Sequence, residues 1–243
     1  MNTYTFNPNE RAGWEEFWRS DMVPQRFQSN AAPNNSVVEW AKTILPGANI
    51  LDVGCGSGRH LTYLGSCGFQ VAGVDISPSG VRLARAACVA RGIVLDGRVS
   101  SMTTLPWPDN TFDGALSTST IHHHLRDGIA LALKEVLRVL KPGGIFLVDF
   151  PSTDTLMYEE FRESFRKGDT MEVEPNTFVD ERPGISDSDG FLPHHFSDEA
   201  DVRDLLRGFE IIKLWADLKD VETAHGQGKS GKWVVWAGKS HSE

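Results

Sequence analysis

Cysteine is scarce in this sequence, and neither a signal-peptide pattern nor an apolar run of membrane-spanning length is present. The three cysteines, Cys55, Cys67 and Cys88, are odd in number, so a framework of disulfide pairs is not expected. The first residues lack the basic and then apolar order of a secretory signal. We therefore expect reduced thiols and a cytoplasmic protein that does not associate with a membrane.

Positive charge is also scarce. The 243 residues include 24 Lys and Arg against 33 Asp and Glu, which gives a formal net charge of −9, and no dense basic stripe occurs. Proteins that bind nucleic acids do so mainly through cationic contacts with phosphate. We therefore expect no nucleic-acid partner. The length of the chain is typical of a single large domain.

The middle of the chain alternates short apolar runs with helical patterns, which is typical of a mainly parallel sheet with right-handed crossovers. A helix is expected from about residue 126, and Pro142 and the glycines after it are expected to end it. The other expected helices cover residues 59–67, 77–91 and 197–207. The expected strands cover residues 49–53, 70–75, 98–101, 112–117 and 145–150, with 209–215 and 232–238 as a closing antiparallel pair.

A glycine-rich turn, DVGCGSG over residues 52–58, follows the first expected strand. Glycines allow a tight turn and a close approach of the main chain to a ligand, and the N–H groups of the next helix favour negative charge. Asp75 ends the second strand, at a spacing from Gly54 that suits a carboxylate accepting both hydroxyls of a ribose. Asp52 lies two residues before Gly54. Both acids also suit plain turn or helix-capping roles, and the spacing alone leaves this alternative open.

Four segments, LDVGCGSG, VDIS, LPWPDNTFD and LKEVLRVLKPGG, lie in this order over residues 49–150. Together they resemble the class I S-adenosylmethionine-dependent methyltransferases. The resemblance implies an α/β fold with a Rossmann-like, seven-stranded, mostly parallel sheet, helices on both faces and an antiparallel last strand. It also implies S-adenosylmethionine as the cofactor and S-adenosylhomocysteine as its product. The Gly-x-Gly-x-Gly spacing argues against a nicotinamide dehydrogenase.

The resemblance also assigns residues to the cofactor. The glycine loop would lie beside its methionine part, Asp52 would reach the amino group, and Asp75 would hold the ribose diol. Ile76 would pack on adenine, with Ser101 and Met102 at the place where many relatives have an acid beside the adenine amino group. The expected cofactor contacts are Asp52, Gly54, Cys55, Gly56, Gly58, Asp75, Ile76, Ser101, Met102 and Ser117.

The methyl acceptor is expected above the fourth strand, because open parallel sheets bind ligands at the carboxyl ends of their strands. Histidines 122–124 follow that strand, and His194 precedes His195 where the chain returns to the sheet. An aliphatic alcohol needs a base, for which histidine is suited, so we predict catalytic roles for His123 and His195. Structural roles at the sheet edge or helix start are the alternative. No metal site is expected, because adjacent histidines on an extended segment point to opposite faces.

We expect four regions within one domain: a helical cap (1–45), a cofactor-binding core (46–150), an insertion over the active site (151–197), and a C-terminal helix with the last two strands (198–243). Trp14, Phe17 and Trp18 lie on one face of a short amphipathic helix, which suits a lid, although simple packing on the core is the alternative. The cap and the insertion resemble those of relatives that enclose metabolites, which favours a small-molecule acceptor. The alternatives are a protein or RNA acceptor, or S-adenosylmethionine binding without methyl transfer.

Overall fold

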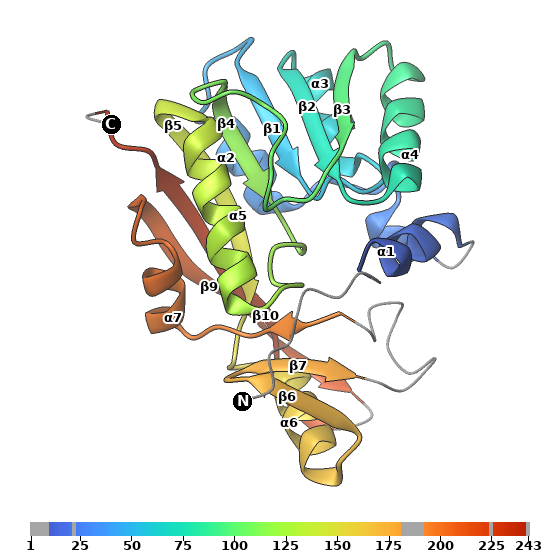
Figure 1. The fold of residues 1–243 in the computed structure, drawn as a ribbon, viewed down its shortest axis with the longest axis vertical. Helices are drawn as coiled ribbons and strands as arrows, with labels where there is room; N and C mark the ends of the chain where they lie inside the picture. Colours follow the sequence, from blue (N-terminus) through green and yellow to red (C-terminus); the bar gives the residue numbers. More distant parts are fainter. Residues whose placement is uncertain (1–9, 21–22, 181–191, 224–225, 242–243) are drawn as a thin grey trace.

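The main feature of the fold is a seven-stranded sheet (Figure 1). The computed structural model describes residues 10–20, 23–180, 192–223 and 226–241. The strands of the sheet are β1 (Asn49–Val53), β2 (Gln70–Asp75), β3 (Leu95–Val99), β4 (Phe112–Ser117), β5 (Leu140–Pro151), β9 (Glu210–Thr223) and β10 (Gly226–Gly238). Their order is β3-β2-β1-β4-β5-β10-β9; the first five in this order are parallel, and β10 is antiparallel to β5 and β9. The expected mostly parallel sheet with an antiparallel last strand is confirmed.

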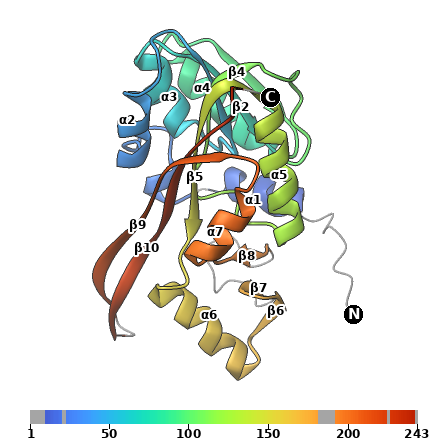
Figure 2. The ribbon, with the colours of Figure 1, turned by 90° about the vertical axis from the view of Figure 1, so that its left-hand side faces the viewer.

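Helices cover both faces of the sheet. They are α2 (Asn35–Ala41), α3 (Arg59–Ser66), α4 (Pro78–Val89), α5 (Arg126–Val139) and α7 (Glu199–Leu205). On one face, Ile129 and Leu133 of α5 belong to an apolar core that α7 also joins. On the other face, Trp40 of α2 and Leu61 of α3 belong to a second core, and Figure 2 shows these helices on the side of the sheet away from α5. No described helix combines the length and the apolar character that a membrane crossing needs.

Several elements differ in extent from the sequence-based expectation. Helix α5 ends at Val139, because the backbone is extended at Leu140 (φ −69°, ψ 140°) and the proline–glycine stretch becomes the start of β5. Strand β3 begins at Leu95 rather than near residue 98. Strands β9 and β10 continue as a long two-stranded ribbon (Figure 2). The ribbon residues 216–222 are exposed or half-buried and show no apolar alternation, which is why the sequence pattern ended too early.

The insertion has regular structure of its own. It contains α6 (Leu156–Lys167) and a three-stranded antiparallel sheet of β6 (Thr170–Glu174), β7 (Thr177–Asp180) and β8 (His194–His195). Aromatic side chains from the helix and sheet contact one another, namely Tyr158, Phe161, Phe178 and Phe196. The sequence showed weak periodicity here and so indicated little regular structure. These aromatic residues instead form a small core that is separate from the cores of the main sheet. Residues 181–191 of the predicted insertion lie outside the described residues.

The insertion leaves and rejoins the main sheet at neighbouring backbone positions. Ser152 and Ser197 form an isolated parallel bridge. The Ser197 N–H donates to the Pro151 carbonyl at 2.9 Å, and the Thr153 N–H donates to the Ser197 carbonyl at 3.2 Å. The predicted limits, residues 151 and 197, therefore coincide with a closed base.

The N-terminal region is helical, as expected of a cap. It contains α1 (Glu10–Arg19), the short 3-10 helix η1 (Gln25–Phe27) and α2. Helix α1 lies against α4, beside the carboxyl ends of the central strands (Figure 1). Residues 1–9 and 21–22 of the predicted cap lie outside the described residues.

Candidate active site

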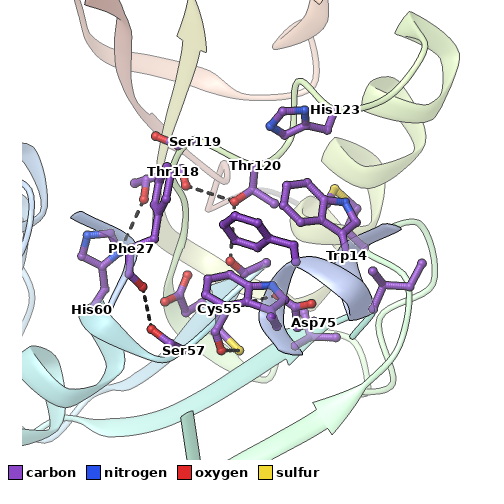
Figure 3. A pocket seen from close by; sticks show the side chains of 18 of the residues that line it. Trp14, Phe27, Cys55, Ser57, His60, Asp75, Thr118, Ser119, Thr120 and His123 are labelled. Atoms are coloured by element: carbon purple, nitrogen blue, oxygen red, sulfur yellow. Dashed lines mark hydrogen bonds between the residues drawn. The ribbon is translucent and has the colours of Figure 1, made fainter. Parts of the chain in front are cut away.

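A cavity lies at the carboxyl ends of β1, β2 and β4, beside α1 (Figure 3). The space between its lining atoms, open solvent included, amounts to about 910 Å³. The described residues that line it come from three places. These are the N-terminal helices, the glycine loop and the start of α3 together with the end of β2, and the loops after β3 and β4. None of these described lining residues belongs to the insertion. The cavity lies at the edge where open parallel sheets bind ligands.

The glycine loop forms the floor of the cavity, and two of its glycines are required by close approaches. Gly54 (φ 76°) and Gly56 (φ 49°) have left-handed backbones that disfavour a side chain. A Cβ atom on Gly54 would lie 2.1 Å from the Thr120 side chain, and one on Gly56 would lie 2.3 Å from the Trp18 ring. The absence of side chains therefore lets Thr120 and the cap approach the main chain.

Gly58 has a different role from the predicted cofactor contact. It precedes α3 and is not among the described residues that line the cavity. A Cβ atom there would lie 2.9 Å from the backbone of Ala84 in α4. This position does not support the predicted cofactor contact; the bare Gly58 lets α3 and α4 pack closely.

Asp75 lines the cavity at the end of β2, as expected for a ribose-binding carboxylate. Its Oδ2 accepts a hydrogen bond from the Gly56 N–H at 2.8 Å, and its Oδ1 accepts one from the Ser77 N–H at 2.9 Å. Burial is the main cause that raises its pKa to about 6, so the carboxylate is mostly ionised at pH 7. Each oxygen retains a lone pair that can accept a further hydrogen bond.

Asp52 and Arg59 supply charges of opposite sign to the cavity. Asp52 is buried at the end of β1, and burial raises its pKa to about 7, against the opposing effect of Arg59. Arg59 is half-buried in the first turn of α3 and also lines the cavity. A carboxylate and a guanidinium group in one cavity suit a ligand that carries both an ammonium and a carboxylate group. The sequence reasoning singled out Asp52 but missed Arg59.

The loops after β2 and β3 place the expected adenine contacts at the cavity, but the end of β4 differs. Ile76, Ser101 and Met102 all line the cavity. Ser117 is fully buried, is not among the described lining residues, and donates a hydrogen bond from Oγ to the Val53 carbonyl at 3.0 Å. It thus joins β4 to β1, and this position does not support the predicted cofactor contact. The next residue, Thr118, lines the cavity instead.

His60 is a cavity residue that the sequence reasoning missed. It is buried in the first turn of α3, directly after the glycine loop. That position in the sequence is the signal that could have identified it. Its Nε2 accepts a hydrogen bond from the Asn34 N–H at 3.4 Å, and its Nδ1 lies 3.4 Å from Oγ1 of Thr118. It therefore holds the cap near the loop after β4.

Aromatic rings of the cap form one wall of the cavity (Figure 3). Trp14, Phe17, Trp18 and Phe27 contribute to it, and Phe17 makes edge contacts with the other three. Glu15, on the same helix, accepts hydrogen bonds from Oγ of Ser77 at 2.6 Å, and from the N–H and Oγ of Ser79 at 2.9 and 2.6 Å. The Ser77 bond is the largest of the causes that lower the Glu15 pKa to about 2. This carboxylate fixes α1 to the start of α4.

His123 lines the cavity, as predicted, but its environment does not suit a base. Burial is the main cause that lowers its pKa to about 3, and burial also lowers the pKa of His124 to about 4. A general base works best when its pKa lies near the working pH. These histidines are therefore neutral and weakly basic at pH 7.

His195 lies away from the cavity, within a buried hydrogen-bond network. Its Nδ1 is 2.7 Å from Oγ1 of Thr177, and its Nε2 is 2.9 Å from Oδ2 of Asp201. Asp201 also accepts hydrogen bonds from Arg126 and Ser197 at 2.8 and 2.9 Å. Nδ1 of His195 thus joins β8 to β7 within the insertion, and Nε2 joins the insertion to α7. This position does not support the predicted contact with the acceptor.

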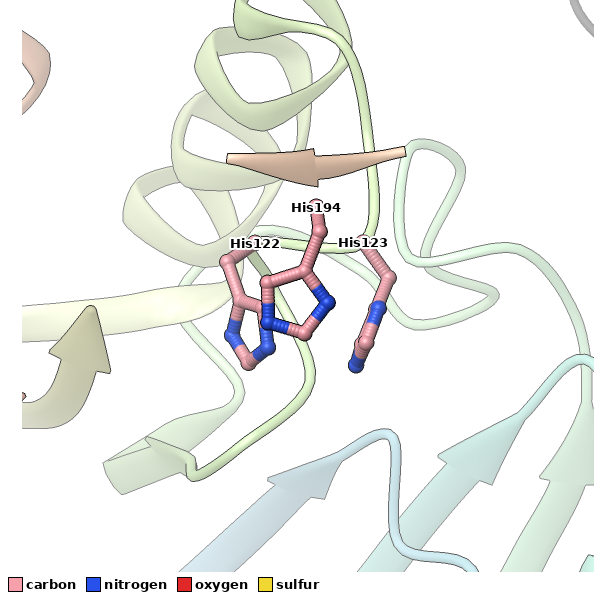
Figure 4. A group of neighbouring side chains, drawn as sticks. All are labelled: His122, His123 and His194. Atoms are coloured by element: carbon pink, nitrogen blue, oxygen red, sulfur yellow. The ribbon is translucent and has the colours of Figure 1, made fainter. Parts of the chain in front are cut away.

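The adjacent histidines after β4 do not point to opposite faces, contrary to the expectation from the sequence (Figure 4). His122 and His123 were expected on an extended segment, whereas residues 121–124 form a turn after β4. The two imidazoles consequently face the same side, with ring centroids 4.1 Å apart, and His194 lies 4.7 and 4.8 Å from them (Figure 4). Three imidazoles therefore meet beside the cavity.

Known proteins with similar sequences are methyltransferases. A family model described as a methyltransferase domain matches residues 51–148. The phosphoethanolamine N-methyltransferase of Triticum aestivum is 36% identical over 118 residues, which is 48% of this chain and 23% of that protein. The ubiquinone biosynthesis O-methyltransferase of Xanthomonas campestris pv. campestris is 33% identical over 104 residues, 43% of each chain. The chain spans less than half the length of these curated relatives.

A solved structure extends the similarity beyond the matched segment. The crystal structure of an S-adenosylmethionine-dependent methyltransferase from Methanosarcina mazei superposes with a TM-score of 0.68 at 26% sequence identity. The alignment covers 86% of this chain and 99% of that one. The fold of this chain as a whole is therefore similar to that of a complete methyltransferase chain.

Proposed function

We propose that the chain transfers the methyl group of S-adenosylmethionine to a small molecule. The reason is that residues 51–148 belong to the class I S-adenosylmethionine-dependent methyltransferase family. The observation that carries the proposal is the cavity at the carboxyl ends of the strands. It combines the bare glycine loop and two buried acids with an aromatic wall and a row of polar side chains after β4. The reaction is an in-line displacement, in which the acceptor atom bonds to the methyl carbon while the bond from carbon to sulfur breaks.

The cofactor is proposed to lie along the carboxyl edge of the sheet, in contact with Asp75 and Asp52. Asp75 accepts the ribose hydroxyls, and Ile76 and Met102 enclose the adenine. Asp52 receives the amino group of the methionine part, and Arg59 receives its carboxylate. This arrangement pairs the ammonium and the carboxylate of the methionine part with opposite charges of the cavity.

The acceptor is proposed to lie between the loop after β4 and the cap. Thr118, Ser119 and Thr120 offer hydroxyl groups there, and Trp14 supplies an apolar face. Aromatic faces also attract a sulfonium cation. The weakly basic His123 and His124 favour an acceptor atom that needs little help to lose its proton, such as a thiol, a phenol or an amine. The relatives act on nitrogen and oxygen, and both remain open for this chain.

The proposal also covers the cellular location of the chain, the class of its acceptor and the role of the insertion. The free thiols of Cys55, Cys67 and Cys88 support a reducing compartment, which in turn supports a cytoplasmic location. The net charge of −9 supports an acceptor other than nucleic acid. The insertion is proposed to act on the acceptor through the histidines beside the cavity rather than as a direct lid.

Methyl transfer is tested with cofactor labelled on the methyl group. The purified chain is incubated with fractions of small molecules, of RNA and of protein, and the labelled product is followed together with S-adenosylhomocysteine. We expect label in the small-molecule fraction only. Label in RNA or protein would contradict the acceptor class. Cofactor binding without any S-adenosylhomocysteine would contradict catalysis itself.

The affinity for S-adenosylhomocysteine is expected to fall as the pH drops below about 7. The ligand amino group is cationic at this pH, and only ionised Asp52, whose pKa is about 7, attracts it. A proton then competes with the ligand, so Kd rises by up to about tenfold per pH unit below that value. Calorimetry between about pH 6 and 7.5 measures the slope.

Asp52→Asn is the matched control for this pH dependence. The amide does not titrate, so the variant binds more weakly and with a flatter pH profile. Asp75, whose pKa is about 6, is present in both proteins and interacts with Asp52 through its charge, so the slopes are compared above about pH 6, where Asp75 is mostly ionised. Equal slopes for the variant and the native chain would reject the assignment of Asp52 to the amino group.

A further inference from the structure

Three imidazoles from two separate segments meet beside the cavity (Figure 4). His122 and His123 belong to the turn after β4, and His194 belongs to β8 of the insertion. Each offers one ring nitrogen, and these nitrogens all lie within 4.8 Å of one another. We call these three residues the histidine triad.

The main chain holds the triad together. The His195 N–H donates to the His122 carbonyl at 2.9 Å, which fixes β8 against the turn. The His123 N–H donates to the Thr120 carbonyl at 3.0 Å, which closes the turn itself. The juxtaposition of the imidazoles therefore follows from backbone hydrogen bonds between the core and the insertion.

Three neutral imidazoles are a typical donor set for Zn²⁺ and related ions. Zinc–nitrogen bonds of about 2.0–2.1 Å place the ligand nitrogens about 3.4 Å apart in a tetrahedral site. The rings therefore need to close slightly, which the broad χ2 preference of histidine allows. A site with three protein ligands leaves a fourth position for water or substrate.

The surroundings of the triad fit a bound cation. Nδ1 of buried His122 has no hydrogen-bond partner within the part of the chain that the structure describes. A backbone hydrogen bond to Pro193 orients the His123 ring, as outer contacts orient the histidines of metal sites. Lys232, a cationic side chain whose charge acts on His122, is itself ion-paired with buried Asp149.

Aromatic side chains pack against two rings of the triad. Phe161 stacks on the His194 ring at a centroid distance of 5.4 Å, and Trp14 meets the His123 ring edge-on at 5.1 Å. We propose that His122, His123 and His194 form a binding site for one divalent transition-metal ion of the Zn²⁺ type. The alternative is that the three rings simply pack as part of this aromatic group.

The position of the site gives the ion a role in the acceptor half of the cavity, and this step rests on the proposed function. His123 lines the cavity, so the ion lies in its wall. An acceptor hydroxyl in the fourth position is acidified by the metal and releases its proton to solvent. Its oxygen then bonds to the methyl carbon, while the carbon–sulfur bond breaks and leaves its electron pair on sulfur.

Cobalt titration of the metal-free full chain tests the site. Co²⁺ in a site with three imidazoles absorbs visible light more strongly than hydrated Co²⁺, and Zn²⁺ displaces it. We expect one equivalent of Co²⁺ to bind with this spectrum. His122→Gln and His194→Gln each remove one of three ligands, so we expect at least about a hundredfold weaker binding.

His124→Gln is the matched control, because His124 is a buried neighbour in the same loop but lies outside the triad. It is expected to retain the Co²⁺ site. Circular dichroism and thermal unfolding show whether each variant is folded. The metal proposal is overturned if the native chain shows no saturable Co²⁺ spectrum, if the triad variants bind as the native chain does, or if the control loses binding equally. No cofactor is present, so a failure of the proposed function leaves this result unaffected.

Discussion

Asp75→Ala is expected to weaken the binding of S-adenosylhomocysteine by about 2–4 kcal/mol, or about 30- to 900-fold in Kd. The carboxylate is proposed to accept two hydrogen bonds from the ribose, and it already anchors the Gly56 N–H of the loop beneath the ligand. Its removal deletes the ribose contacts and leaves the loop N–H without its acceptor. Isothermal titration calorimetry with the full chain measures the change.

Asp96→Ala is the control for Asp75→Ala. Asp96 is an acid on the neighbouring strand β3, where it pairs with Arg98 and accepts a hydrogen bond from Nε1 of Trp107 at 2.8 Å. It is not among the described residues that line the cavity. We expect unchanged cofactor affinity for this variant. Unchanged affinity for Asp75→Ala would remove the ribose contact from the proposal.

Lys232→Met is expected to lower the free energy of unfolding by about 3–5 kcal/mol. The side chain of Asp149 is only 1% exposed, and the Lys232 ammonium is its ion-pair partner across β5 and β10. Without the lysine, a carboxylate stays buried with no opposite charge beside it. Urea unfolding of the variant and the native chain measures the loss.

The double variant Asp149→Asn with Lys232→Met is expected to recover most of that stability. Its amide oxygen still accepts the hydrogen bond that the Ser119 N–H gives to Asp149 at 2.7 Å, and no buried charge remains. That bond matters for the cavity, because Ser119 lines it with a left-handed backbone (φ 54°). A double variant as unstable as Lys232→Met would show that lost packing, rather than an unpaired charge, causes the effect.

The central strands and the cofactor edge were predictable because their signals are local. Strands β1, β2 and β4 coincide with the expected ranges, since each is a short apolar run that ends in a turn or an acid. The bare glycine loop and the acid at the end of β2 follow from backbone needs that few other residues meet. Most residues assigned from this pattern line the cavity.

The acceptor side was less predictable because it depends on distant contacts. The side chains of Ser117 and Thr118 point to opposite sides of an extended chain, so a shift of one residue separates a strand contact from a cavity contact. His122 and His123 share a side because of a turn, and His194 reaches them through strand pairing across the insertion. The hydrophobic periodicity of one segment does not predict contacts between segments that are distant in the sequence.

The closed base of the insertion gives the protein two parts that change independently. Because Ser152 and Ser197 pair at the point of departure, the 44 residues between them can lengthen, shorten or be exchanged without altering any register in the main sheet. The proposed cofactor contacts lie on the sheet edge and the cap, and none of the described residues that line the cavity belongs to the insertion. Chemical selectivity can therefore diversify through one module while the methyl donor stays the same.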